Sequence, residues 1–264
     1  MTRVLSIQSH VVSGYVGNKC STITLQCLGI ITDSINTVQF SNHTGYSSFS
    51  GRIGQPNELL ELCQGLNNNK LNNYDAILSG YVHSSEYLKT LHETIHETRK
   101  NGIKFIYVCD PVLGDEGKLY VDSSLIDVYK NNLIPIANII TPNQFEAELL
   151  TNMKIKNESD VIICIQKLHS LGPKIVVITS VKFDKYRFYA SQKEDDQFQI
   201  YSCDLDYVDL RFVGSGDLLS ALLLGWYLRL NGDLKKTISI SLSTMQTILK
   251  DTKNHFDTSK SKRI

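Results

Sequence analysis

Short apolar segments alternate with longer segments in which apolar residues recur at helical spacing. The apolar segments predict strands at residues 4–9, 35–40, 75–80, 104–109, 138–140 and 175–179. The last of these is almost entirely β-branched, which is typical of a strand buried on both faces. The other segments predict helices at residues 18–28, 56–66, 84–100, 144–150 and 159–171. Because strands and helices alternate, we expect a three-layer α/β/α fold around a mostly parallel sheet.

The pattern changes after residue 180. Residues 186–190, 198–202 and 207–213 are short strand-like runs, and residues 193–196 predict a charged hairpin tip. Residues 218–226 are apolar on every side, which predicts a buried helix. The chain ends with a predicted amphipathic helix near residues 234–249 and a polar tail from residue 250 to 264. We expect this tail to fray. With no internal repeat and no long linker, we expect a single domain over residues 1–264.

A Gly-Ser-Gly-Asp turn, Gly214 to Asp217, opens directly onto the predicted buried helix. Gly214 and Gly216 allow the backbone to approach a ligand closely. The unpaired N–H groups at the helix start, together with the helix dipole, predict an anion site with Asp217 at its mouth. An acid beside an anion site favours phosphoryl transfer, with Asp217 ionised and accepting the proton of the attacking hydroxyl. A tight connection without a ligand explains the turn equally well, so the rest of the chain must decide.

Polar residues follow the predicted strands at their carboxyl ends, where open α/β sheets bind ligands. They are Ser9, His10, Asn42, His43, Thr44, Tyr81, Asp110, Asp115, Thr141, Asn143, Thr179 and Ser180. Their common position favours an enzyme.

Composition narrows the class of partner. Acidic and basic residues balance at 27 each, so no strong field favours nucleic acid or an anionic membrane surface, and we expect a small-molecule partner. The 6 cysteines form no Cys-x2-Cys pair and fall in apolar segments, which predicts buried thiols in a reducing compartment. The N-terminus lacks a signal-peptide core, and no apolar run reaches the ~18 residues of a membrane span. We therefore expect a soluble, cytoplasmic protein.

The segment from His92 to His96 matches the His-Glu-x-x-His zinc motif. A predicted strand follows this helix where a third metal ligand should lie. We interpret the match as a coincidence on a helix flank and predict no metal ligands there.

Four segments resemble pyridoxal kinases, which belong to the ribokinase-like superfamily. They are residues 6–18 (SIQSHVVSGYVGN), 38–46 (VQFSNHTGY), 109–115 (CDPVLGD) and 140–151 (ITPNQFEAELLT). The likeness extends from residue 1 to about residue 230, whereas the Gly-x-Gly-Asp turn alone marks only the superfamily.

The resemblance implies a ribokinase-like fold and transfer of the γ-phosphoryl group of ATP to the 5′-hydroxymethyl group of pyridoxal, pyridoxine or pyridoxamine. It also implies a divalent cation, Mg²⁺ or Zn²⁺, and a monovalent cation, K⁺ or Na⁺. Members of the family are commonly dimers, so the resemblance implies a homodimer. The segment between Asp115 and Tyr120 resembles a short lid, in which we expect Gly117 to act as the hinge.

The resemblance also assigns roles to single residues. It implies substrate contacts from Ser9, Thr44, Tyr81, Tyr120 and Asp217. It implies cation contacts from Asp110, Asp115, Thr141 and Glu146. It implies contacts to the nucleotide, its phosphates or its metal from Asp110, Asn143, Glu146, Thr179, Ser180, Val208, Ser215 and Gly216. The catalytic group would be Asp217 as general base, with Gly214, Ser215 and Gly216 as the anion hole. Either Glu146 or its neighbour Glu148 is expected to be a solvated helix flank.

Three alternatives belong to other functions. A hydroxymethylpyrimidine kinase has the same fold and a similar substrate ring. A catalytically silent protein that binds the vitamer would not require Asp217 together with both glycines. A dinucleotide-binding oxidoreductase is disfavoured because Leu219 stands where its fingerprint needs a third glycine.

Overall fold

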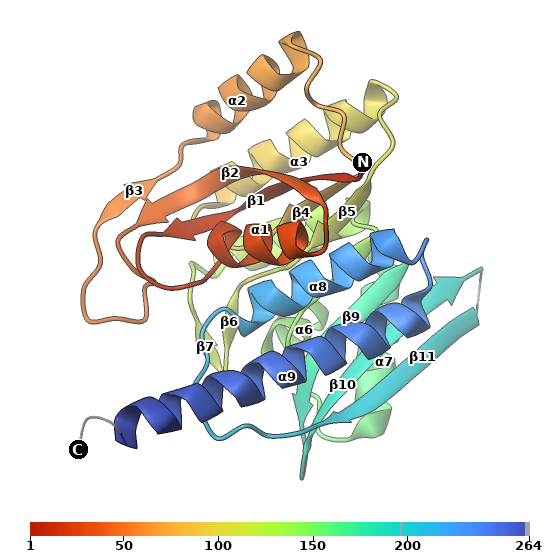
Figure 1. The fold of residues 1–264 in the computed structure, drawn as a ribbon. Coiled ribbons are helices and arrows are strands. Elements are labelled where there is room, and N and C mark those ends of the chain that lie inside the picture. The colour runs from red at the N-terminus through yellow and green to blue at the C-terminus, as the bar shows by residue number, and fades with distance from the viewer. Residues whose placement is uncertain (196, 262–264) are drawn as a thin grey trace.

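The computed structural model describes residues 1–195 and 197–261, without the side chains of residues 259–261, and Figure 1 shows its fold. Among these residues, nine strands form one sheet. In spatial order they are β11 (Gln197–Leu205), β10 (Tyr186–Glu194), β9 (Ile175–Lys182), β8 (Ile139–Ile140), β5 (Ile106–Cys109), β4 (Ala76–Ser79), β1 (Arg3–Val11), β2 (Ile31–Phe40) and β3 (Gly51–Ile53). The six strands from β9 to β2 are parallel, and β10, β11 and β3 are antiparallel additions at the two sides.

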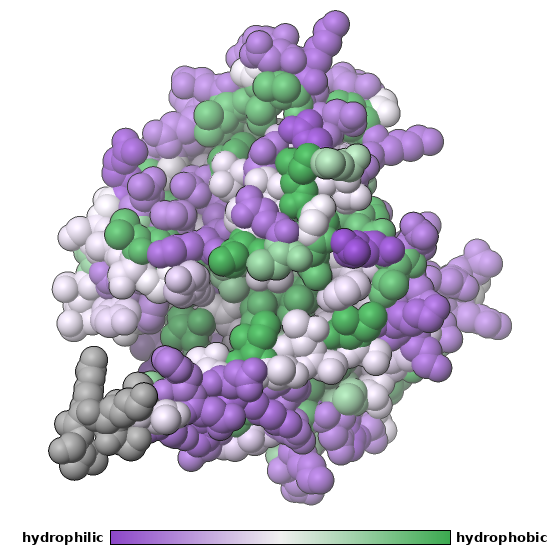
Figure 2. All heavy atoms as spheres, in the orientation of Figure 1, coloured by the Kyte–Doolittle hydropathy of each residue, from purple (hydrophilic) through white to green (hydrophobic). Residues whose placement is uncertain are grey.

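Helices cover both faces of the sheet, which confirms the three-layer α/β/α prediction (Figure 1). One face carries α1 (Asn18–Cys27), α8 (Ser215–Arg229) and α9 (Leu234–Ser261). The opposite face carries α2 (Pro56–Asn68), α3 (Ser85–Lys100), α4 (Ser124–Val128), the π-helical turn η1 (Tyr129–Leu133), α5 (Ile134–Ile136), α6 (Gln144–Thr151) and α7 (Glu158–Ser170). Figure 2 shows that the outer side of α9 is largely hydrophilic, as an amphipathic helix requires.

The two faces of the sheet bury separate hydrophobic cores. In β9, Val176 and Ile178 point into one core while Ile175 and Val177 point into the other. This alternation explains why the sequence of β9 is a continuous β-branched run rather than an alternating one. The buried-strand prediction for this segment is therefore confirmed.

The order of the strands indicates where a ligand crevice lies. The chain passes from β1 to β2 on one side, and then returns to β4 on the other side of β1. Such a reversal opens a crevice beyond the carboxyl ends of the strands. The predicted polar clusters follow the carboxyl ends of these parallel strands.

Several expectations from the sequence are wrong. Residues 207–213 form no strand, and the chain runs from β11 through a loop into α8. Residues 250–261 of the predicted polar tail are helical, because α9 continues to Ser261 with an ion pair between Lys253 and Asp257, and the rest of that tail lies outside the described residues. Cys27 and Cys203 are exposed rather than buried. No helix among the described residues has the length and hydropathy needed to cross a membrane.

Candidate functional site

The N-terminus of α8 lies at the carboxyl edge of the sheet, and its two glycines play different parts. Gly214 has φ +85°, and a side chain there would collide with the carbonyl oxygen of Tyr15. At Gly216, in contrast, a methyl group would meet no other atom within 4 Å. Gly214 shapes the turn, whereas the backbone at Gly216 remains open to a ligand. The N–H groups of the first turn are therefore available to an anion.

Asp217 lies in the first turn of α8 and is half-buried. Burial raises the pKa of its carboxyl to about 6. A hydrogen bond from the backbone N–H of Gly17 has the smaller, opposite effect of lowering that pKa. The carboxyl is thus mostly ionised at pH 7 but close enough to neutrality to accept a proton. Gly17 itself has φ +54° and leaves no room for a side chain against Ser9. The tight turn at Gly17 thereby joins Ser9 to Asp217.

A second acid, Asp110, follows β5 and is buried. Ser220 of α8 donates a hydrogen bond to Oδ2 of Asp110 at 2.9 Å, and the hydroxyls of Ser220 and Thr141 lie 3.0 Å apart. Burial and the charge of Asp217 raise the pKa of Asp110 to about 7, while the two hydroxyls lower it. Asp110 and Thr141, which the sequence predicts at one cation site, therefore lie together.

Glu146 is a buried carboxylate held almost entirely by backbone groups. It forms a capping box with Asn143, in which each residue accepts a hydrogen bond of 2.9 Å from the backbone N–H of the other. Its other oxygen accepts a 2.9 Å hydrogen bond from the N–H of Leu113. Burial and the charge of Asp110 raise the pKa of Glu146 well above its usual value. The expectation that Glu146 or Glu148 is solvated is wrong, because both are buried and Glu148 pairs with Lys154 at 2.6 Å.

Three carboxyl groups thus act on one another at this edge: Asp217 on Asp110, and Asp110 on Glu146. A cation beside them would relieve this repulsion. No group of three or more Asp, Glu, His or Cys side chains in residues 1–195 and 197–261 is arranged to hold a metal by itself.

The residues assigned to the substrate occupy different environments. Ser9 is buried at the end of β1, whereas Thr44 is exposed in the loop between β2 and β3. Tyr81 follows β4, where its carbonyl accepts a hydrogen bond of 2.7 Å from Thr37. Its hydroxyl lies 3.3 Å from Nδ1 of His83, and burial raises its pKa.

The predicted lid is a small hairpin. Strands β6 (Gly114–Asp115) and β7 (Lys118–Leu119) pair, and the turn between them has φ +49° at Glu116 and +79° at Gly117. Asp115 lies on this hairpin, is exposed and accepts a 2.8 Å hydrogen bond from the N–H of Glu116. Its neighbour Gly114 donates a 3.4 Å hydrogen bond from its backbone N–H to the buried Glu146. Tyr120, 52% exposed, follows the hairpin.

The residues assigned to the nucleotide lie on two segments. Thr179 and Ser180 are in β9, and the N–H of Thr179 donates a 3.0 Å hydrogen bond to the carbonyl of Pro142. Val208 lies in the loop between β11 and α8, where its carbonyl accepts a 2.7 Å hydrogen bond from the N–H of Leu210. This loop leads directly into the anion site.

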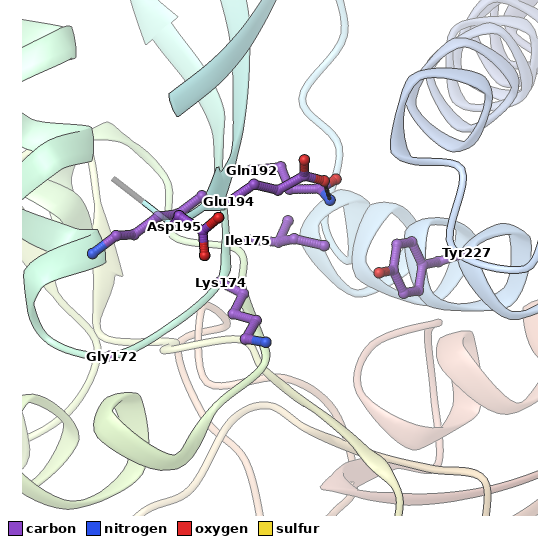
Figure 3. A pocket seen from close by; sticks show the side chains of 8 residues that line it. Gly172, Lys174, Ile175, Gln192, Glu194, Asp195 and Tyr227 are labelled. Carbon is purple, nitrogen blue, oxygen red and sulfur yellow. Dashed lines mark hydrogen bonds between the residues drawn. The ribbon is translucent and has the colours of Figure 1, made fainter. Parts of the chain in front are cut away.

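Two other features lie outside the site. His92 and His96 are adjacent on α3, with ring centroids 6.2 Å apart, and Nδ1 of His92 lies 3.0 Å from the carbonyl of Asn132. A cavity of about 600 Å³ lies where β9 begins, beside Lys174 and Ile175 (Figure 3). Its lining residues are Gly172, Lys174, Ile175, Gln192, Lys193, Glu194, Asp195 and Tyr227. None of the residues predicted for the site contributes to it.

Some residues that build the site are missed by the sequence analysis. Ser220 is the clearest, because a polar residue in an otherwise apolar helix is a visible signal. Gly17 and the N–H groups of Leu113 and Gly114 act through the backbone on Asp217 and Glu146. Side-chain chemistry gives no sign of such contacts.

Comparisons with known proteins agree with this geometry. A family model described as phosphomethylpyrimidine kinase matches residues 69–260. The pyridoxal kinase of Arabidopsis thaliana is 44% identical over 95% of this chain and 82% of its own length. The human pyridoxal kinase is 42% identical over 95% of this chain and 85% of its own length.

A solved structure of pyridoxal kinase from Leishmania donovani, in complex with ADP and pyridoxamine, superposes with a TM-score of 0.88 at 32% identity. The match covers 94% of this chain and 89% of that one, so the ribokinase-like fold extends over nearly the whole chain. With this fold, and with identity above 40% to named relatives over most of its length, the chain belongs to the pyridoxal kinase family.

Proposed function

We propose that this chain transfers the γ-phosphoryl group of ATP to the 5′-hydroxymethyl group of pyridoxal, pyridoxine or pyridoxamine. The observation that carries the proposal is the start of α8, where the half-buried Asp217 adjoins the open backbone of Gly216. A hydroxyl-bearing substrate needs a base, and a transferring phosphoryl group needs hydrogen-bond donors where its charge develops. The first turn of α8 offers both.

In this reaction the hydroxyl oxygen forms a bond to the γ-phosphorus, and the bond from phosphorus to the β–γ bridging oxygen breaks. ADP leaves with that oxygen, and the hydroxyl proton passes to Asp217. The N–H groups of Ser215 and Gly216 would donate to the transferring oxygens. Because Asp217 has a pKa of about 6, it can accept the proton and release it to water at neutral pH.

The cation roles are also proposals. Mg²⁺ or Zn²⁺ would neutralise charge on the phosphates, and Asp110, Asn143 and Glu146 would hold it through water and through ATP. K⁺ or Na⁺ would lie at Asp110 and Thr141. The raised pKa values of the two buried acids support cation binding, since neither acid is stable as an uncompensated anion.

The residues around the crevice take the remaining roles. Ser9, Thr44 and Tyr81 would contact the vitamer ring, with Tyr120 covering it. A second set, Asp115, Thr179, Ser180 and Val208, would line the metal and nucleotide side. We further propose a homodimer in the cytoplasm. All six cysteines are free, which supports a reducing compartment.

One assay tests the proposal against its nearest rival. The name of the matching family model favours a pyrimidine substrate as the second candidate. Purified protein should consume ATP when it is offered pyridoxal and form pyridoxal 5′-phosphate, detected by its absorbance or by mass spectrometry. Preference for hydroxymethylpyrimidine would support the rival. Binding of pyridoxal without ATP consumption would indicate a silent vitamer-binding protein.

A further inference from the structure

A chain of buried polar side chains reaches the start of α8, and the proposed chemistry does not use it. Ser6 and Gln8 lie on β1 and Ser21 lies on α1, and none of the three is more than 1% exposed. The side-chain nitrogen of Gln8 donates two hydrogen bonds of 2.9 Å, one to each serine hydroxyl. Buried polar groups add little more stability than apolar side chains of the same shape would. A satisfied buried network instead fixes the relative positions of the elements that it joins.

The number of hydrogens sets the direction of this chain of hydrogen bonds. The side-chain nitrogen of Gln8 carries two hydrogens, and both are donated. The hydroxyl of Ser21 accepts one of them and has a single proton of its own. It donates that proton to the backbone carbonyl of Asp217 at 3.4 Å. The amide of Gln8 is thus joined to the first turn of α8 through one hydroxyl.

Two further contacts join the first turns of α1 and α8. The thiol of Cys20 lies 3.7 Å from the carbonyl oxygen of Gly214. The backbone N–H of Gly17 donates to the carboxyl of Asp217. The start of α8 is therefore docked against the start of α1. Ser21 differs from the other two contacts because a side chain of β1 orients it.

The side chain of Gln8 also lies next to residues assigned to the vitamer. Ser9 follows Gln8 directly on β1. The side-chain oxygen of Gln8 leaves no room for a side chain at Gly80, which immediately precedes Tyr81. Gln8 is thus adjacent to two proposed ring contacts, and Ser21 connects it to the proposed base.

We propose that Gln8 and Ser21 are positioning residues, which hold Asp217 at a fixed place relative to the vitamer. This inference rests on the proposed phosphoryl transfer. Neither residue exchanges a proton with the substrate. They fix the first turn of α8 against β1, so that the carboxyl of Asp217 stays within hydrogen-bond reach of the substrate hydroxyl. Catalysis is sensitive to such placement, because a displacement of about 1 Å can lower the rate roughly 100-fold.

Ser21→Ala and Ser6→Ala form a matched pair that tests this role. Each variant removes one buried hydroxyl and one 2.9 Å hydrogen bond from the same nitrogen of Gln8, but Ser21 also donates to α8. Both should lower Tm by a similar amount, about 2–4 °C. Ser21→Ala should lower kcat about tenfold, with KM for pyridoxal and for ATP within about twofold of the wild type. Ser6→Ala should keep kcat within about twofold, and Ser21→Thr should restore most of kcat because it keeps the hydroxyl.

The comparison of the two serines decides the inference. Equal losses of kcat in both variants would mean that the network only supports the fold, and an unchanged kcat in Ser21→Ala would mean that α8 is positioned without it. Either result overturns the inference. If Ser21→Ala does not fold, Ser21→Cys takes its place, because a thiol fills similar space but is a weak donor. A normal kcat in that variant would likewise overturn the inference.

Failure of the proposed function would look different. A wild type that phosphorylates no vitamer would contradict the phosphoryl transfer itself. An active wild type whose kcat is insensitive to Ser21→Ala would contradict only the positioning role.

Discussion

The two glycines of the anion site should respond in opposite ways to the same substitution. Gly214 has φ +85° and lies against the carbonyl oxygen of Tyr15, whereas Gly216 faces open space. Alanine at Gly214 strains the fold, and alanine at Gly216 places a methyl group where the phosphoryl oxygens would lie. The two alanine variants therefore distinguish the role of Gly214 in shaping the turn from the role of Gly216 in binding the phosphate.

The magnitudes follow from the local geometry. Left-handed backbone costs a non-glycine residue about 1–2 kcal/mol, and the contact with Tyr15 adds to this, so Gly214→Ala should lose roughly 2–3 kcal/mol of unfolding free energy. For a chain of this size that loss lowers Tm by roughly 5–10 °C. Gly216→Ala should keep or slightly raise Tm, because alanine is favoured over glycine in a helix by up to about 1 kcal/mol. Its turnover should fall about 100-fold, the loss typical of a damaged anion hole.

Differential scanning fluorimetry and a coupled ATPase–vitamer assay measure both effects on the same preparations. If Gly216→Ala kept its Tm and phosphorylated pyridoxal at more than about a third of the wild-type rate, the space in front of Gly216 would not hold the phosphoryl group. If it lost stability as Gly214→Ala does, the free space that the structure shows there would be wrong.

Three further predictions follow from the site. kcat/KM for pyridoxal should fall about tenfold per pH unit below pH 6, because Asp217 must be unprotonated and its pKa is about 6. A bound cation would shift this decline to lower pH. A rate that stays constant down to about pH 4 would contradict the role of Asp217 as the base. Excess chelator should abolish turnover. Ser220→Ala should weaken activation by K⁺ or Na⁺, because the hydroxyl of Ser220 links Asp110 and Thr141. An unchanged dependence on alkali ions would contradict a monovalent-cation site at Asp110 and Thr141. Gly117→Pro should disrupt the hairpin turn, because proline cannot adopt φ +79°, and should raise ATP hydrolysis relative to vitamer phosphorylation; an unchanged ratio would show that the hairpin does not exclude water.

Local sequence pattern predicted most strands and helices, because each is set by its own hydrophobic spacing. The pattern gave wrong predictions where the structure of a segment depends on the neighbouring element against which it packs. Residues 207–213 have the composition of a strand, but β11 forms the edge of the sheet and the chain turns away from it into α8. Residues 124–136, which contain α4, η1 and α5, were assigned to no element, since short helical turns broken by Pro135 give no clear period.

The candidate site shows the same division. Residues at strand ends were predicted, because parallel strands present their carboxyl ends at one edge. Contacts between distant segments were not. Ser220 and Asp110 are 110 residues apart in sequence, and only the packing of α8 on the sheet brings them to 2.9 Å. The pairing of the lid into a hairpin was not predicted either, and its turn has positive φ angles at Glu116 and Gly117.

The measurement that tests the central claim most directly is the turnover of Asp217→Asn with ATP and pyridoxal, alongside its Tm and its affinity for AMP-PNP. Asparagine suits a helix start about as well as aspartate, so fold and nucleotide binding should be preserved. Loss of the base should lower kcat by about 10²–10⁴-fold, or roughly 3–5 kcal/mol of barrier. The account predicts this collapse with Tm within about 2 °C of the wild type. Near-normal turnover by the folded variant would contradict it and leave Asp217 as no more than a residue of the helix start.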